Sequence, residues 1–485
     1  MTRLTVRVVR LVRGSAGHLA RPIVLAFIVA LWALPSPASR AAVFNPKTFT
    51  LSNGLQVVVV ENHRLPVIRQ LLFYRVGASD DPAGKSGLAH YLEHLLFKGT
   101  KTIAPGEFSK IVARNGGRDN AFTSNDTTAY YQTLSKDQLE LVMRLEADRM
   151  ANLVIAPEEA VPELQVVIEE RRSRVDNRPA AQLDEHMEAA LYMHHPYRVP
   201  VIGWQHELKT LTVQDALDFF KIHYAPNNAI LIIAGDVTLD EVRLLAEKYY
   251  GVIPSNPAIK PRVRLQEPPQ RAARRVVMHS PQVREPSFSR EYLAPSHTSG
   301  QTKHGYALEI LSDILGGGTT SRLYRKLVIE KKLALGVSTN YDGDVFGPAA
   351  FGFGLRPRSN VDVGVAEAGL DSEIKRLITD GVSEEELATA KRRLMAGAVF
   401  ARDSLRRGAV TIGTAITAGM SIADVENWPE RIKAVTREQV LSAARHTLRP
   451  ERSVTGLLLP ENSKARSDKP SRRRAQARRT QEGAN

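Results

Sequence analysis

A segment that joins a helix to a following apolar strand occurs twice in this 485-residue chain. The first copy begins at Thr212 and turns at Pro226, and the second begins at Thr436 and turns at Pro450. In both copies the Thr and the Pro are fourteen residues apart, and the copies are offset by 224 residues. Repetition at a fixed offset indicates an internal duplication. We therefore expect two similar domains, each mixing helices and strands.

Composition places the boundaries of these domains. A stretch rich in Pro, Gln and Arg lies between the copies, from Pro254 to Arg275, and is typical of a linker. The expected organisation is a signal peptide at 1–42, a first domain at 43–258, a linker at 259–275, a second domain at 276–462 and a basic disordered tail at 463–485.

The ends of the chain carry most of its positive charge. Residues 1–40 and 463–485 each have a net charge of +6, which leaves +2 of the formal +14 for the rest. No basic motif interleaved with aromatic residues occurs between them, so we expect no nucleic-acid binding. Interaction with a membrane or nucleic acid through the basic ends remains an alternative function.

The N-terminus has the pattern of an export signal. A basic region precedes the apolar stretch 23–34, and small residues follow at 35–42. Twelve apolar residues are few for a membrane span, so we expect no stable span after cleavage and a periplasmic or secreted bacterial protein. Anchoring in the inner membrane by an uncleaved signal is the alternative.

Within the first domain, His90, Glu93 and His94 form an H-x-x-E-H motif in a leucine-rich run. Residues four apart lie on one face of a helix, so the two imidazoles can face one point. Two neutral imidazoles suit Zn²⁺, and the chain has no cysteine to offer instead. Glu93 can accept a proton from water activated by the metal. The alternative is two histidines of an ordinary core beside an unrelated carboxylate.

A charged helix expected at 157–175 offers further carboxylates. Glu163 and Glu170 are seven residues apart and lie on one helical face, whereas Glu169 points about 100° away from Glu170. We expect Glu170, rather than Glu169, to be the third zinc ligand. Without the upstream motif, an ordinary solvated acidic helix would explain either residue.

These motifs resemble those of the pitrilysin/insulinase family of zinc peptidases, which includes the mitochondrial processing peptidase. The resemblance covers about residues 45–460 and is most specific in three patterns. They are H-x-x-E-H at 90–94, the carboxylates Glu163 and Glu170 beginning 69 residues after His94, and the run Gly116-Gly117-x-x-Asn120-Ala121-Phe122-Thr123.

The resemblance implies an α+β fold in which two homologous α/β-roll domains form one half of a peptidase chamber. It implies one Zn²⁺ per chain, held by His90, His94 and Glu170, with Glu93 as general base and Glu163 supporting the ligands. The activity implied is that of a zinc metalloendopeptidase acting on unfolded peptides. Substrate is expected to add as a strand along a sheet edge, which we place at 120–131, with contacts from Asn120, Ala121, Phe122 and Thr123.

One departure from the family pattern concerns the second domain. Active members place an Arg and, about seven residues later, a Tyr near the zinc, but here those positions fall at Val328 or Ile329 and at Leu335. None of these side chains can donate a hydrogen bond to a developing oxyanion. We expect a homologous insulinase-like subunit to supply the pair, or, as a second choice, a homodimer with weakened catalysis. A non-catalytic, peptide-binding or chamber-forming subunit is the alternative function.

Overall fold

The computed structural model describes residues 43–461. The predicted signal peptide and basic tail lie outside these described residues, so both stay predictions. Within the described part, no helix is both long and apolar enough to cross a membrane.

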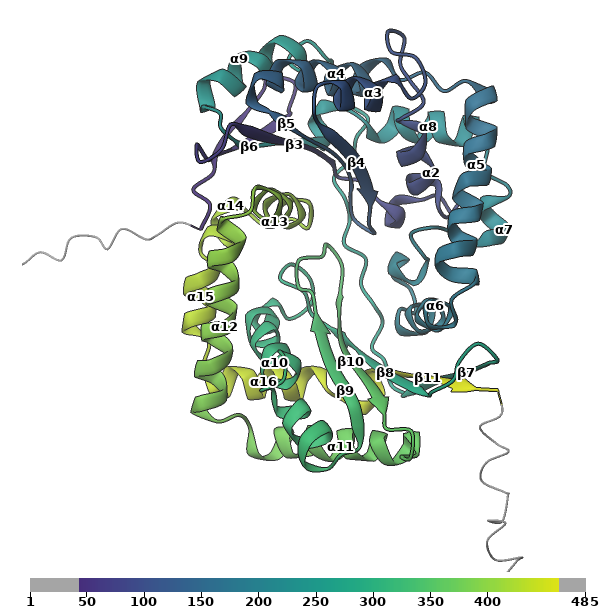
Figure 1. Ribbon diagram of the computed structural model, residues 1–485, viewed down its shortest axis with the longest axis vertical. Helices are drawn as coiled ribbons and strands as arrows, with labels where there is room; N and C mark the ends of the chain where they lie inside the picture. Colours follow the sequence, from purple (N-terminus) through teal and green to yellow (C-terminus); the bar gives the residue numbers. More distant parts are fainter. Residues whose placement is uncertain (1–42, 462–485) are drawn as a thin grey trace, which may run out of the picture. The chain divides into compact units, whose positions relative to one another are not determined.

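Two mixed sheets organise the described chain (Figure 1). The first has the strand order β1-β2-β6-β3-β5-β4, and the second has the order β7-β11-β8-β10-β9. The strands of the first sheet are β1 (Lys47–Thr50), β2 (Gln56–Glu61), β3 (Val67–Tyr74), β4 (Arg118–Thr123), β5 (Thr128–Ser135) and β6 (Ala229–Gly235). Those of the second are β7 (Arg274–Ser280), β8 (Ser287–Ala294), β9 (Ala334–Tyr341), β10 (Ala349–Pro357) and β11 (Ser453–Pro460).

Runs of strands are followed by runs of helices in both halves, and most neighbouring strands are antiparallel, so the fold is α+β as predicted. The helices of the first half are α2 (Leu88–Leu95), α3 (Glu107–Arg114), α4 (Leu139–Asn152), α5 (Pro157–Arg171), α6 (Pro179–Leu191), α7 (Gln205–Leu208), α8 (Val213–His223) and α9 (Leu239–Tyr249). Those of the second half are α10 (Gly305–Gly316), α11 (Val363–Asp380), α12 (Glu384–Arg402), α13 (Leu405–Thr417), α14 (Ile422–Glu426), α15 (Trp428–Ala434) and α16 (Arg437–Thr447).

The repeated sequence segment forms the same unit in both halves. Thr212 and Thr436 are the N-caps of α8 and α16, and each accepts a hydrogen bond from the backbone three residues later in a capping box. The strand that follows lies inside its sheet, because β6 is parallel to β2 and antiparallel to β3, and β11 is parallel to β7 and antiparallel to β8. The pairing around these strands is therefore equivalent in the two halves.

Helix α13 belongs to the second half in sequence but packs on the first sheet. Its residues Ala409 and Ile412 share a buried cluster with Leu71 and Phe73 of β3 and Ile232 of β6. The opposite face of that sheet is covered by α2, α4 and α9 of the first half. The predicted domain boundaries stay a prediction. They assign α13 to the second domain, although this helix packs on the sheet of the first.

The segment between α9 and β7 is tied to both halves around Asp126. Arg262 of this segment forms ion pairs with Asp80 and Asp126, and its guanidinium lies 4.5 Å from the ring centroid of Phe346. The Phe346 backbone N–H donates to Asp126 at 2.9 Å. This network fixes a stretch without helix or strand against the loop between β9 and β10.

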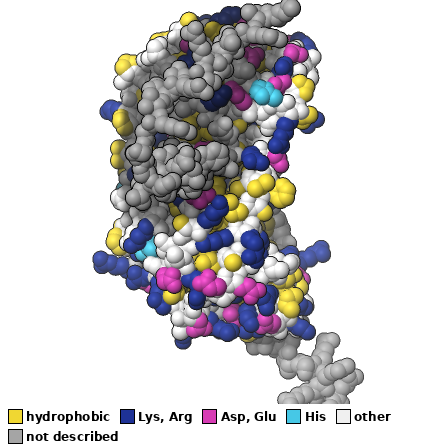
Figure 2. All heavy atoms as spheres, turned by 90° about the vertical axis from the view of Figure 1, so that its left-hand side faces the viewer, with side chains coloured by type: hydrophobic (Ala, Val, Ile, Leu, Met, Phe, Trp, Pro, Cys, Tyr) yellow, Lys and Arg dark blue, Asp and Glu magenta, His cyan; other side chains and the backbone are white. Residues whose placement is uncertain are grey.

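Charges of both signs alternate on the face that carries α12 and α15 (Figure 2). Lys and Arg side chains lie among Asp, Glu and apolar side chains on the described part of this face. It therefore presents no broad surface of a single charge.

The packing of α13 predicts opposite effects for two helical glycines. A Cβ at Gly413 would lie 2.3 Å from the ring of Phe73, whereas a Cβ at Gly397 of α12 meets no atom within 4 Å. We expect Gly413→Ala to lower the free energy of unfolding by about 1–3 kcal/mol through overpacking. We expect Gly397→Ala to raise it by about 0.5–1 kcal/mol through helix propensity. Denaturant unfolding measures both, and equal effects would contradict this packing.

Candidate metal centre

Helix α2 carries the H-x-x-E-H motif and is fixed at its start by Asp81. The two carboxylate oxygens of Asp81 accept the backbone N–H groups of Gly87 and Ala89, each at 2.8 Å. Gly87 has φ of 85°, a left-handed conformation that suits glycine. The leucines of the motif point into the core of the first half, so the remaining face presents His90, Glu93 and His94.

Helix α5 brings the predicted carboxylates to this face. The Tyr91 hydroxyl donates to the carbonyl of Ala160 at 2.7 Å and joins α2 to α5. Glu170 Oε2 then lies 3.5 Å from His90 Nε2 and 3.3 Å from His94 Nε2. The three groups offer ligand atoms that all lie within 4.8 Å of one another.

The donor set fits a zinc ion. Ligand atoms about 2.0–2.1 Å from a tetrahedral zinc are separated by about 3.4 Å, and the two distances to Glu170 Oε2 agree with that value. This oxygen is buried and makes no hydrogen bond to any described residue. Burial, with His94 nearby, lowers the pKa of His90 to about 3. The His90 imidazole is therefore neutral and keeps a lone pair for a metal.

Glu163 orients the second imidazole. His94 Nδ1 lies 2.8 Å from Glu163 Oε1, which leaves Nε2 facing Glu170. Burial alone would lower the pKa of His94, but the hydrogen bond to Glu163 and the neighbouring carboxylates raise it above its ordinary value. The imidazole of His94 is therefore surrounded by carboxylates, which would also attract a cation.

Two cations that sequence reasoning missed hold the carboxylates in place. Lys98 pairs with Glu163, and Arg174 Nη2 lies 2.7 Å from Glu170 Oε1. Arg174 lies four residues after Glu170, so helical spacing was a signal that could have found it. Lys98 lies beyond the end of α2, and its pairing with Glu163 depends on the contact between α2 and α5, which local spacing does not indicate.

Glu93 faces the same region but lies outside the ligand set. It is 8% exposed, and burial raises the pKa of its carboxyl group. The Thr123 hydroxyl donates to Glu93 Oε2 at 2.5 Å. A hydrogen-bonded carboxylate beside a possible metal position is suited to take a proton from water.

A cleft of about 690 Å³ contains these groups and the four residues predicted to contact substrate. Asn120, Ala121, Phe122 and Thr123 line it from β4, the last strand of the first sheet. The predicted edge at 120–131 is wrong in its second part. The chain turns after Thr123, and β5 lies between β3 and β4, so Tyr131 is on an interior strand.

Every residue that lines this cleft lies between His90 and Ile202. The second half contributes no residue to the lining of this cleft. The positions where the family pattern has its Arg and Tyr are therefore absent from the lining as well. Val328 is buried in the second core, whereas Ile329 and Leu335 are exposed. Arg322, one of two arginines shortly before these positions, is paired with Glu386.

Comparisons with known proteins agree with this architecture. Residues 56–204 match the family profile "Insulinase (Peptidase family M16)", and residues 210–394 match "Peptidase M16 inactive domain". The chain is 38% identical over 290 residues to the zinc protease PqqE of Helicobacter pylori. The aligned region covers 59% of this chain and 65% of the relative. It is 30% identical over 438 residues to an uncharacterized zinc protease of Mycobacterium tuberculosis, covering 88% of this chain and 96% of the relative.

Solved structures give the same result. A protease from Helicobacter pylori superposes with a TM-score of 0.80 at 30% identity, covering 86% of this chain and 99% of that one. The periplasmic protease PqqL from Escherichia coli has the same fold, with a TM-score of 0.74 at 20% identity. This match covers 88% of our chain and 48% of PqqL, so the chain spans about half of that protein. The resemblance predicted from the motifs is confirmed, and the chain belongs to the insulinase family of peptidases, M16.

Proposed function

We propose that this chain is a zinc-dependent endopeptidase that hydrolyses unfolded peptides. The observation that carries the proposal is the convergence of His90, His94 and Glu170 beside a buried Glu93, in a cleft on an edge strand. Relatives named zinc proteases support a peptidase function. A periplasmic or secreted location is part of the proposal, and a relative of the same fold is a periplasmic protease.

The residues of the site would have separate roles in peptide hydrolysis. A bound zinc ion would polarise water and the scissile carbonyl group. Glu93 would accept the proton of the attacking water and return it to the leaving amine. Thr123 fixes the orientation of the Glu93 carboxylate through its hydrogen bond, and Glu163 does the same for the His94 imidazole.

Peptide would bind as an added strand on β4. This strand pairs only with β5 among the described strands, so its other edge has backbone groups that can bind a peptide backbone. Recognition through backbone groups favours unfolded peptides and depends weakly on their sequence.

We further propose that a homologous subunit completes the active site. No residue after Ile202 lines the cleft, and the positions of the family's Arg and Tyr hold apolar side chains. The M16 relative PqqL spans about twice the length matched here. A homodimer with weakened catalysis is the second choice.

The proposed ligand set predicts the metal content of three variants. Glu170→Gln should lose most of its zinc, because a carboxylate ligand is replaced by an amide. Glu169→Gln is the matched control and should retain one zinc per chain, since its side chain is 66% exposed and paired with Arg172. Glu163→Gln should weaken zinc affinity by about 10–100-fold. Metal analysis after dialysis checks all three, and full zinc in Glu170→Gln would refute the ligand set.

The proposed general base predicts that metal binding and turnover can be separated. Glu93→Gln should retain zinc and lose at least about a hundredfold in peptide hydrolysis. The measurement is the cleavage rate of an unfolded fluorogenic peptide, with zinc content measured on the same preparation. Cleavage at the parental rate would exclude Glu93 as the base. A parent protein that binds zinc and peptide without cleaving in any combination would favour the non-catalytic alternative.

The split active site predicts dependence on a partner. The purified chain should cleave peptides slowly or not at all alone, and mixing with a homologous M16 subunit that carries Arg and Tyr should restore activity. Rates measured against the ratio of the two chains should saturate near one to one. Full activity of the isolated monomer would rule out the need for a second subunit.

A further inference from the structure

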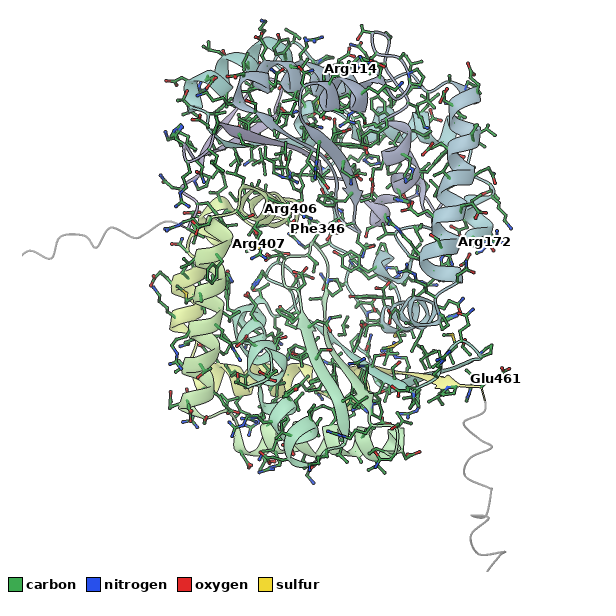
Figure 3. The ribbon with its side chains drawn as sticks, viewed as in Figure 1. Arg114, Arg172, Phe346, Arg406, Arg407 and Glu461 are labelled. Carbon is green, nitrogen blue, oxygen red and sulfur yellow. The ribbon has the colours of Figure 1, made fainter. Side chains whose placement is uncertain are left out.

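A second cleft, of about 830 Å³, lies between the first sheet and the start of α13. We call it the arginine cleft, because Arg69 of β3 and Arg406 and Arg407 of α13 line it. Figure 3 shows Arg406 and Arg407 at the start of α13. Phe122 of β4 and Tyr131 of β5 form its aromatic wall.

Arg69 is a buried cation without a counter-ion. The residue is 8% exposed and forms no ion pair with any carboxylate of residues 43–461. Its Nη1 donates to Thr133 Oγ1 at 2.8 Å, its guanidinium lies 4.3 Å from the Tyr131 ring centroid, and its Nε has no hydrogen-bond partner among the described residues. Burial and the nearby Arg406 lower its pKa. An unpaired buried charge is costly, so this arrangement calls for an anion.

Arg406 and Arg407 add positive charge where it is least favourable for the helix. They lie in the first turn of α13, whose cap Ser404 accepts the backbone N–H of Arg407 at 3.2 Å. The start of a helix carries partial positive charge and disfavours cations. Neither arginine forms an ion pair within the described part of the chain. Three guanidinium groups and a helix start therefore face one cleft without a carboxylate among them.

The arginine cleft adjoins the proposed catalytic cleft through β4. Phe122 lines both clefts, and Thr123, its neighbour, contacts Glu93. Arg69 lies in the same row of the sheet as Arg118, because both pair with Thr133 of β5. On β4, Arg118 is five residues from Thr123, which corresponds to about 17 Å in an extended strand.

We propose that the arginine cleft binds a carboxylate of the peptide lying along β4. The group would be an Asp or Glu side chain, or the C-terminal carboxylate, about five residues from the scissile bond. Guanidinium groups bind carboxylates through paired hydrogen bonds, which suits them to this task. The inference rests on the proposed peptidase function and adds a preference for acidic peptides to it.

Peptide binding to a catalytically inactive variant tests this proposal. The probes are fluorescein-labelled peptides in which the scissile bond has been mapped. Each carries a single Asp, or a matched Asn, about four to six residues before or after that bond. They are titrated against the zinc-loaded full chain carrying Glu93→Gln, and anisotropy reports the Kd. A further pair of peptides ends in a carboxylate or an amide at the same distance and distinguishes a terminal carboxylate from a side chain.

We expect the carboxylate to tighten binding by about tenfold or more in one of these series. The preference should vanish when Arg406→Gln and Arg407→Gln are added together. Both side chains are exposed, so the fold should tolerate these changes. Arg402→Gln is the control for a nearby loss of positive charge and should retain the preference, because it removes one arginine that is exposed and does not line the cleft.

The outcomes separate this inference from the proposed function. Equal Kd values for acidic and neutral peptides in every series would overturn the carboxylate site and leave the peptidase intact. Equal weakening of both peptides by the double substitution would also overturn it, because the arginines would then act without selecting a carboxylate. Failure of all peptides to bind would reject the peptide-binding function itself.

Discussion

The candidate site depends on the contact between α2 and α5. The two imidazoles are placed by local geometry alone, since His90 and His94 are one helical turn apart. Glu170 lies 76 positions later in the sequence and reaches them only because α5 packs against α2, with Ala160 and Val167 fully buried in the shared core. The bond from Tyr91 to the Ala160 carbonyl fixes the register of the two helices. Core packing thus holds the three donor atoms together.

Much of this arrangement could be predicted from sequence, because the signals are local. The motif helix, the carboxylates on one face of the next helix and the repeated helix–strand unit all follow from periodicity and capping residues. The choice of Glu170 over Glu169 also came from helical geometry. In the structure, Glu170 faces the imidazoles, whereas the side chain of Glu169 is 66% exposed and paired with Arg172.

The missed features depend on contacts between distant segments. Thr123 was predicted to contact substrate, but that its hydroxyl holds Glu93 depends on where β4 lies relative to α2. The predicted edge is too long because it runs through the turn at 124–127, whose Ser, Asn, Asp and Thr residues are typical of turns and were a signal that could have marked it. The packing of α13 on the first sheet could not be predicted for a related reason. Its pattern predicts one buried face, but a pattern does not say which sheet will cover it.

The position of α13 gives a reason for keeping a second half that lacks the H-x-x-E-H motif. Gly413 allows this helix to approach Phe73 closely, and its apolar face covers the side of the first sheet that α2 and α4 leave open. The same approach carries Arg406 and Arg407 to the wall formed by Phe122 and Tyr131. Strand β4 consequently has one cleft built by its own half and another completed by the duplicated half. A peptide added to its free edge would run past both, so the second half can influence which peptides bind without providing catalytic groups.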